Sequence, residues 1–165
     1  MSYLTYLIDH YDNLPPIIAF VHAHKDGYPK AWHTDAAEYS NVNSLKTLRQ
    51  NFVLQEGYVN LRCIWIPGCP SEIQPFRKTD GWRASEHVFI DAWEYMFGKD
   101  VPVPKKVGAA CCSQFAVSAE QVRKRPKQQY ERIRQWLLET EIIDEISGRV
   151  MEYIWHVLFG KEAVL

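Results

Sequence analysis

Residues 17–24 read Ile-Ile-Ala-Phe-Val-His-Ala-His, a short apolar run that ends in two histidines. The two prolines at 15 and 16 stop the helical pattern of residues 3–13, because a proline disfavours helical backbone in the residue before it. The run that follows is short and rich in branched side chains. It is typical of a strand that is buried on both faces, so residues 17–21 are predicted to form such a strand.

Helices and strands alternate along the rest of the chain. Apolar spacing and terminators predict helices at 44–52, 85–97, 127–139 and 145–159, and strands near 59–65 and 107–117. Ser118 and the glutamine at 121 match a capping box, which predicts a helix start there. Apolar strands separated by helices indicate a layered α/β fold, with a small, mostly parallel sheet flanked by helices. The chain has no internal repeat or long linker, so residues 1–165 are expected to form a single domain.

Composition excludes several classes of protein. Of the 165 residues, 47% are hydrophobic, and the 19 basic and 20 acidic residues leave a net charge of −1. This balance gives no reason to expect nucleic acid or an anionic membrane as a partner. We find no apolar run near the roughly 20 residues that a membrane span needs, and no signal peptide, so we expect a cytoplasmic protein. A cytoplasmic chain would keep its four cysteines reduced, although Cys63 and Cys69 could pair in an oxidising compartment.

Three histidines and an aspartate form the strongest functional signal. His22 and His24 would share one face of the strand, because side chains alternate along a strand with a period of two. His33 and Asp35 follow in the next loop. Such nitrogen and oxygen ligands suit a divalent metal, Zn or Mn. The alternative is that the histidines only form hydrogen bonds with the loop that crosses them.

A second polar cluster lies near the carboxyl end. Arg149, Glu152 and His156 are spaced by three and four residues, so on one helix they would share a face. The surrounding residues are apolar, and buried ionisable groups need partners. Either the three side chains satisfy one another, or they face the cleft that contains His22. In the second case Glu152 would be a general base or ligand, and Arg149 would hold an anionic group.

Other residues are weaker candidates. Cys111 and Cys112 would point to opposite faces of a strand, so at most one could reach a given site, and neither has an evident activating base. Gln114, between apolar residues, is the better candidate for a hydrogen bond to a ligand. Trp32 lies in a predicted loop and could line a pocket for a sugar or another flat molecule.

Several motifs resemble a largely fungal family known as a domain of unknown function, number thirty-four thirty-one. The resemblance covers essentially the whole chain, and it lies in residues 5–15, 20–24, 57–63, 67–70, 111–117 and 147–156.

The chain is also distantly similar to A-type glycosyltransferases. In those enzymes a helix leads into an apolar strand that ends in Asp-x-Asp, which binds a metal and the donor nucleotide. Here His22 and His24 stand at those positions, and the earlier strand-helix segment that helps hold the nucleotide is not seen before residue 2. The resemblance therefore implies a truncated scaffold that binds nucleotide sugars weakly. A homodimer could cover its exposed strand edge.

Together these signals favour a small metal-assisted, transferase-like enzyme that acts on a small metabolite or sugar. Two alternatives stay open: a metal-free tailoring enzyme of secondary metabolism with histidine as acid and base, and a non-catalytic binding module. The expected catalytic residues are His22, His24, Glu152 and Arg149. The expected substrate-binding residues are Trp32, Gln114 and His156, and the expected metal ligands are His22, His24, His33 and Asp35.

Overall fold

A three-stranded antiparallel sheet organises the computed structural model, which describes residues 1–78 and 80–165. The strands are β1 (Ile17–Phe20), β2 (Tyr58–Asn60) and β3 (Phe115–Ser118), in the order β1-β3-β2. Both outer strands run antiparallel to β3. A strand is thus confirmed at Ile17–Phe20, but burial alternates along this outer strand and it is not buried on both faces. The prediction of a mostly parallel sheet is wrong. Within the described residues the fold is rich in helices and its sheet is small.

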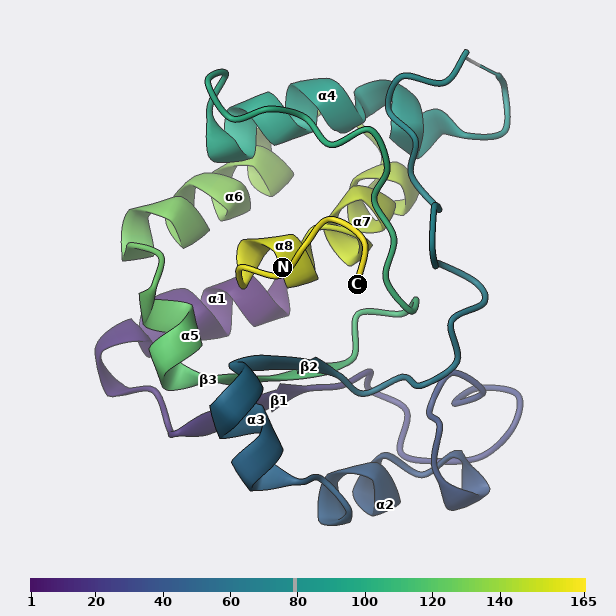
Figure 1. The fold of residues 1–165 in the computed structure, drawn as a ribbon, viewed down its shortest axis with the longest axis vertical. Coiled ribbons are helices and arrows are strands. Elements are labelled where there is room, and N and C mark those ends of the chain that lie inside the picture. Colours follow the sequence, from purple (N-terminus) through teal and green to yellow (C-terminus); the bar gives the residue numbers. More distant parts are fainter. Residues whose placement is uncertain (79) are drawn as a thin grey trace.

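The prediction of parallel strands is wrong for a physical reason. All four residues of β3 are buried, and a continuously buried strand is typical of a parallel sheet covered by helices on both faces. Here the same burial arises because β3 is the central strand and helices cover both of its faces, while its neighbours run the other way (Figure 1). Burial reports how many faces are covered. It does not report the direction of the neighbouring strands.

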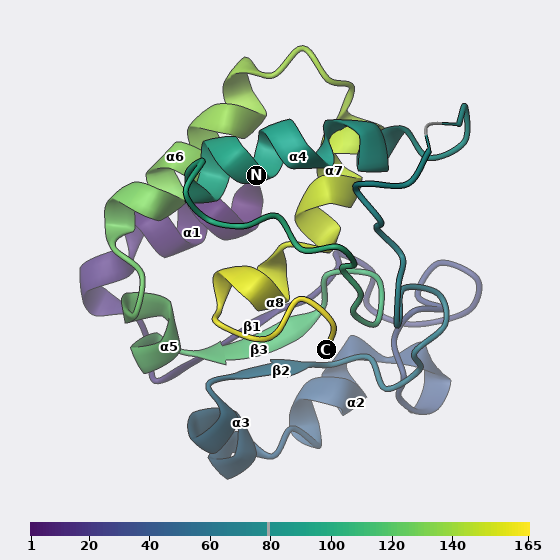
Figure 2. The same ribbon diagram turned by 45° about the horizontal axis from the view of Figure 1, so that its top comes forward.

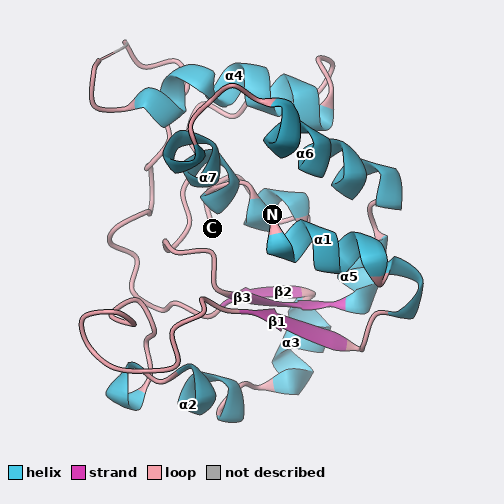
Figure 3. Ribbon diagram, turned by 180° about the vertical axis from the view of Figure 1, so that it is seen from behind, coloured by secondary structure: helices cyan, strands magenta, loops and turns pink. Residues whose placement is uncertain are grey.

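Helices lie on both sides of the sheet (Figures 1 and 3). The smaller layer contains α2 (Asn41–Lys46) and α3 (Gln50–Glu56). The larger layer contains α1 (Ser2–Asp9), α4 (Ala84–Phe97), α5 (Ala119–Arg123), α6 (Lys127–Glu139), α7 (Asp144–Glu152) and α8 (Trp155–Leu158). In that layer α1 packs on α6, and α4 packs on α6 and α7 (Figure 2). Two short 3-10 turns, Tyr11–Asn13 and Ala37–Tyr39, complete the described elements.

The predicted helix boundaries agree best with the structure where local sequence signals are strong. The helix at 127–139 is confirmed, and Ser118 caps α5 by accepting a hydrogen bond from the Gln121 amide at 3.1 Å. The helix predicted at 44–52 is two helices with a break between them. Only the last three residues of the strand predicted at 107–117 belong to β3. The helix predicted at 145–159 is interrupted between α7 and α8. His156 therefore does not share a helix face with Arg149 and Glu152.

The core is built around an aromatic cluster on β3. Phe115 has no exposed surface, and its ring centroid lies 5.2 to 5.9 Å from those of five other rings, Tyr3, Phe20, Tyr58, Trp155 and Phe159. Together these contacts join α1, all three strands and α8. In the part of the chain that the structure describes, no helix is long and apolar enough to cross a membrane.

Candidate functional site

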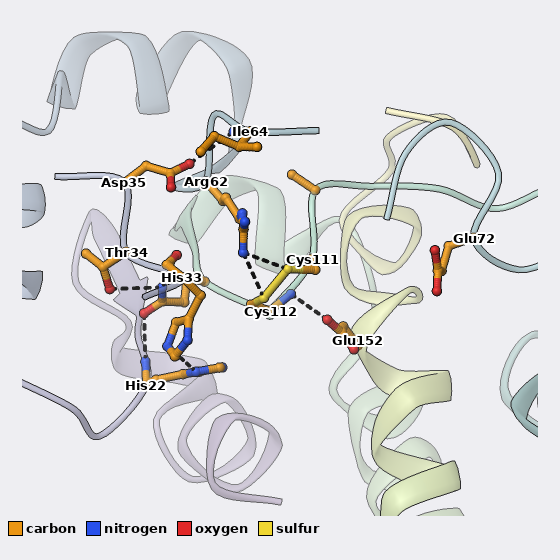
Figure 4. The surroundings of a disulfide bond; sticks show 12 residues. His22, His33, Thr34, Asp35, Arg62, Ile64, Glu72, Cys111, Cys112 and Glu152 are labelled. Carbon is orange, nitrogen blue, oxygen red and sulfur yellow. Dashed lines mark hydrogen bonds between the residues drawn. A yellow bond between two sulfur atoms is a disulfide. The ribbon is translucent and has the colours of Figure 1, made fainter. Parts of the chain in front are cut away.

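Two histidines contact each other directly beyond the end of β1. Nδ1 of His22 lies 2.7 Å from Nε2 of His33, a hydrogen-bond distance, and the ring centroids are 4.3 Å apart (Figure 4). The His24 ring centroid lies 5.9 Å from that of His33, and His24 is exposed. The strand ends at Phe20, so His22 and His24 lie in irregular backbone and the predicted alternation of side chains does not apply to them.

Buried amide side chains hold this histidine segment in place. Gln114, which is 2% exposed, accepts a hydrogen bond from the His22 amide at 3.0 Å and donates to the His33 carbonyl at 3.3 Å. Asn41 donates to the carbonyls of His22 and His24 and accepts from the Thr34 hydroxyl. Because these groups are buried and satisfied, they fix the backbone around both imidazoles.

The environment keeps both imidazoles neutral. Burial lowers the pKa of His22, and the nearby charge of His24 adds to this effect, while the Cys112 backbone acts in the opposite direction. Burial, followed by the charges of His22, His24 and Arg62, lowers the pKa of His33 to about 4. At neutral pH the pair is therefore two uncharged rings that share one hydrogen bond.

We expect the free energy of unfolding to fall as the pH drops from about 6.5 to 4. In that window the unfolded chain binds a proton at residue 33, with a pKa near 6.5, whereas folded His33 stays neutral. Above pH 6.5 His33 is neutral in both states and contributes no slope. The loss of stability from this group should reach roughly 3 kcal/mol at pH 4.

Urea unfolding of the wild type and His33→Gln across this range measures the effect. The stability difference between the two proteins should change with pH in that window. If it stays constant from pH 6.5 to 4, the lowered pKa of His33 is contradicted.

An open cavity of about 620 Å³ lies between the histidine segment and α7. Its described lining includes one carboxylate, that of Asp144, and no lysine or arginine side chain. The lining residues are Met1, Ser2, Tyr3, Val21, His22, Ala23, His24, Ser113, Leu137, Asp144, Ser147, Gly148, Met151 and Trp155. The cavity is therefore mixed in polarity and poor in positive charge.

Of the predicted site residues, His22 and His24 line this cavity and the others do not. Oδ2 of Asp35 accepts hydrogen bonds from the amides of Cys63 and Ile64, at 2.8 and 3.0 Å, so its carboxylate fixes a loop (Figure 4). Trp32 lies with its ring 4.6 Å from the Arg62 guanidinium. The ligand atoms of the three histidines and Asp35, which were expected to bind a metal together, do not lie close to one another as a group. Among the described residues, the group that does so is Cys111, Cys112 and Glu152, within 4.8 Å of one another.

Comparison with known proteins identifies the family. The family model described as "Protein of unknown function (DUF3431)" matches residues 1–165. The chain belongs to the DUF3431 family. No curated protein and no solved structure matches it.

The second predicted cluster, Arg149, Glu152 and His156, is split between two helices in this DUF3431 chain. Arg149 forms ion pairs with Glu152, at 3.3 Å, and with Glu72. His156 lies in α8, beyond the break, where its Nε2 contacts the Ala163 carbonyl at 3.0 Å and the side chain is fully buried. Burial lowers the pKa of His156. None of the three lines the described cavity beside His22, although neighbouring α7 residues do.

The cysteines differ most from their predicted roles. Cys111 and Cys112 are joined by a disulfide, whereas Cys63 and Cys69 are free. The assumption of opposite strand faces is wrong, because this segment is not a strand and Cys112 has a φ of 85°, in the left-handed region. Glu152 accepts a hydrogen bond from the Cys112 amide at 2.5 Å.

Sequence reasoning missed three buried polar residues in this DUF3431 site: Thr34, Asn41 and Arg62. Each lies in or beside a segment predicted as loop or short strand, where a polar side chain is ordinarily exposed. The only available signal was their position close to the histidine segment and the predicted strand near 59–65.

Proposed function

We propose that the chain is a metal-free enzyme that acts on a small, uncharged, hydroxylated metabolite, with His22 as its acid–base group. One observation carries this proposal. His22 lines the cavity, and its ring is also hydrogen-bonded to the buried ring of His33. An exposed lone histidine would not require a partner of this kind. A purely structural pair would not need to border an open cavity.

The paired rings support both directions of proton transfer. Two neutral imidazoles carry two protons between four nitrogens, and one proton occupies the hydrogen bond between the rings. The outer nitrogens are then one donor and one acceptor. These roles exchange when the outer acceptor nitrogen takes up a proton, the shared proton crosses to the other ring, and the outer donor nitrogen of that ring releases its proton to solvent. His22 can therefore take a proton from a substrate hydroxyl or return one, while the lowered pKa values keep the pair in its neutral, basic form.

The lining of the cavity supports an uncharged substrate. Anionic groups such as phosphate are usually bound by arginine, lysine or a helix N-terminus. The described lining contains no lysine or arginine; the first turns of α1 and α7 do border the cavity, but α7 begins with the Asp144 carboxylate, which repels an anion there. The hydroxyls of Ser113 and Ser147 and the aromatic residues Tyr3 and Trp155 suit a hydroxylated molecule with an apolar face. The same lining disfavours nucleotide sugars, in keeping with the weak binding expected from the sequence.

The geometry also disfavours the metal-assisted alternative. A catalytic zinc commonly has three protein ligands. In the described structure Asp35 is engaged by two backbone amides, and the histidine nitrogens do not form a cluster of three. We therefore propose histidine acid–base chemistry and not Lewis-acid chemistry.

Substrate conversion tests this proposal. A panel of monosaccharides, polyols and small phenols is incubated with the chain, and proton NMR follows each compound with a chelator, with Zn²⁺ and with Mn²⁺. We expect at least one uncharged compound to be converted in the presence of the chelator. Conversion only with metal would restore the metal-assisted hypothesis, and absence of conversion under every condition would favour a binding module.

Gly148→Leu is expected to weaken binding of any converted compound by about tenfold, without loss of stability. Gly148 lines the cavity, and a Cβ atom built there meets nothing within 4 Å, so a longer side chain can occupy the space without a clash. Leucine also favours a helix over glycine by close to 1 kcal/mol. Calorimetric titration measures affinity, and thermal unfolding measures stability. Unchanged affinity in a folded variant would place the binding site elsewhere.

A further inference from the structure

The disulfide between Cys111 and Cys112 joins neighbouring residues just before β3 (Figure 4). Cys111 is 2% exposed, whereas Cys112 is partly exposed. Neither cysteine lines the described cavity beside His22. A thiol from solution would therefore reach the sulfur of Cys112 more readily than that of Cys111.

A buried arginine faces this disulfide. Arg62 is 6% exposed, and its Nη1 lies 2.8 Å from the Cys111 sulfur and 3.3 Å from the Cys112 sulfur. Its Nε has no hydrogen-bond partner, and no carboxylate forms a salt bridge with it in the described ranges. The Trp32 ring, 4.6 Å away, is its aromatic neighbour.

This arrangement leaves a buried positive charge without a negative partner. Burial of a charge is costly unless an opposite charge or strong hydrogen bonds compensate it. Sulfur in a disulfide is neutral and a weak acceptor. A thiolate at Cys111 would carry a full negative charge at the same 2.8 Å position. The guanidinium thus complements the reduced state better than the oxidised one.

We propose that Cys111 and Cys112 form a reversible thiol–disulfide site whose reactants are low-molecular-weight thiols of the glutathione class. An external thiolate attacks the sulfur of Cys112, the bond between the two protein sulfurs breaks, and its electron pair stays on Cys111 as a thiolate next to Arg62. A second external thiolate then attacks the external sulfur of the mixed disulfide and releases Cys112. Overall, two thiols reduce the protein disulfide to a dithiol and become one small disulfide, with both protons transferred to the protein or solvent.

Neighbouring groups favour this reaction over metal binding at the same residues. Glu152 Oε1 accepts a hydrogen bond from the Cys112 amide at 2.5 Å, and Oε2 lies 3.3 Å from Arg149, so its carboxylate positions Cys112. The buried charge of Arg62 repels a cation but attracts a thiolate. Reversible cycling requires a compartment that contains thiols.

Glutathione redox titration of the full chain tests the proposal. Cys63 and Cys69 are replaced by serine in every sample so that the other two cysteines alone react. After quenching and alkylation, mass spectrometry gives the dithiol-to-disulfide ratio. In Arg62→Gln we expect this ratio to fall about tenfold at a given redox poise and reduction to slow, because a charge-assisted hydrogen bond to the thiolate is lost. The ratio for Arg62→Lys should lie between those of the parent and Arg62→Gln. Arg49 is exposed, so the ratio for Arg49→Gln should match that of the parent.

Single-cysteine variants keep the test decisive if Arg62→Gln does not fold. With Arg62 intact, Cys111→Ser should form a mixed disulfide with oxidised glutathione at Cys112 about tenfold faster than Cys112→Ser forms one at the buried Cys111. The proposal is overturned if glutathione does not reduce the native disulfide or if Cys111 reacts faster than Cys112. An unchanged dithiol-to-disulfide ratio in folded Arg62→Gln would also overturn it.

Discussion

His22→Gln is expected to slow conversion of the substrate by about 10²- to 10⁴-fold, the usual contribution of a general acid or base. Glutamine can still form a hydrogen bond with His33, but it cannot exchange a proton at neutral pH. Binding should therefore change much less than the catalytic rate, since the rest of the cavity lining is intact. NMR-followed conversion gives the rate, and calorimetry gives the affinity.

His10→Gln is the matched control for this substitution. His10 is exposed at the end of α1 and does not line the described cavity, so its replacement should leave the rate unchanged. Equal rates for wild type and His22→Gln would remove His22 from the mechanism. Equal losses of rate in both variants would indicate a general effect on folding.

Phe115→Ala is expected to lower the free energy of unfolding by about 3–5 kcal/mol, the usual cost of removing a buried phenylalanine ring. Phe115 is fully buried on the central strand, and its ring contacts aromatic residues from α1, both outer strands and α8. Because domains of this kind are stable by only about 5–15 kcal/mol, much of the variant could unfold near room temperature. Urea unfolding followed by circular dichroism measures the change.

Phe52→Ala tests whether the effect depends on burial. Phe52 is 49% exposed on α3, so its loss should change stability by no more than about 0.5 kcal/mol. A similar loss of stability in both variants would contradict the assignment of β3 as the centre of the core.

Local signals in the sequence account for the elements that were predicted well. The amphipathic pattern and the preceding proline define α6, and the Ser118 cap defines the start of α5. The strand at Ile17–Phe20 is equally clear from its composition, although its burial on one face only is not. Strand direction, in contrast, depends on how distant segments pair, and a three-residue β2 offers too little pattern to show it. The break between α7 and α8 has no proline or glycine to mark it.

The candidate site was predicted only in part, because sequence spacing indicates which residues are near along the chain and not how distant segments meet. Proximity in sequence indicated a histidine-rich centre, and the structure brings His22 and His33 into contact. Spacing along an assumed strand could not show that Asp35 turns to the amides of Cys63 and Ile64. Arg62 could not be found from any periodic pattern, because it lies in irregular backbone and reaches the cysteine pair 49 residues away through the fold.

Chemical-shift mapping of compound binding by amide NMR, in the presence of a chelator, tests the central proposal most directly. If the histidine pocket is a metal-free substrate site, a converted compound should shift the amide signals of His22, Ser113 and Gly148, which line the cavity from three different segments. Signals of residues on the far layer, such as Phe52 in α3, should stay in place. Shifts that arise only after Zn²⁺ is added, or that map away from the cavity, would contradict the proposal.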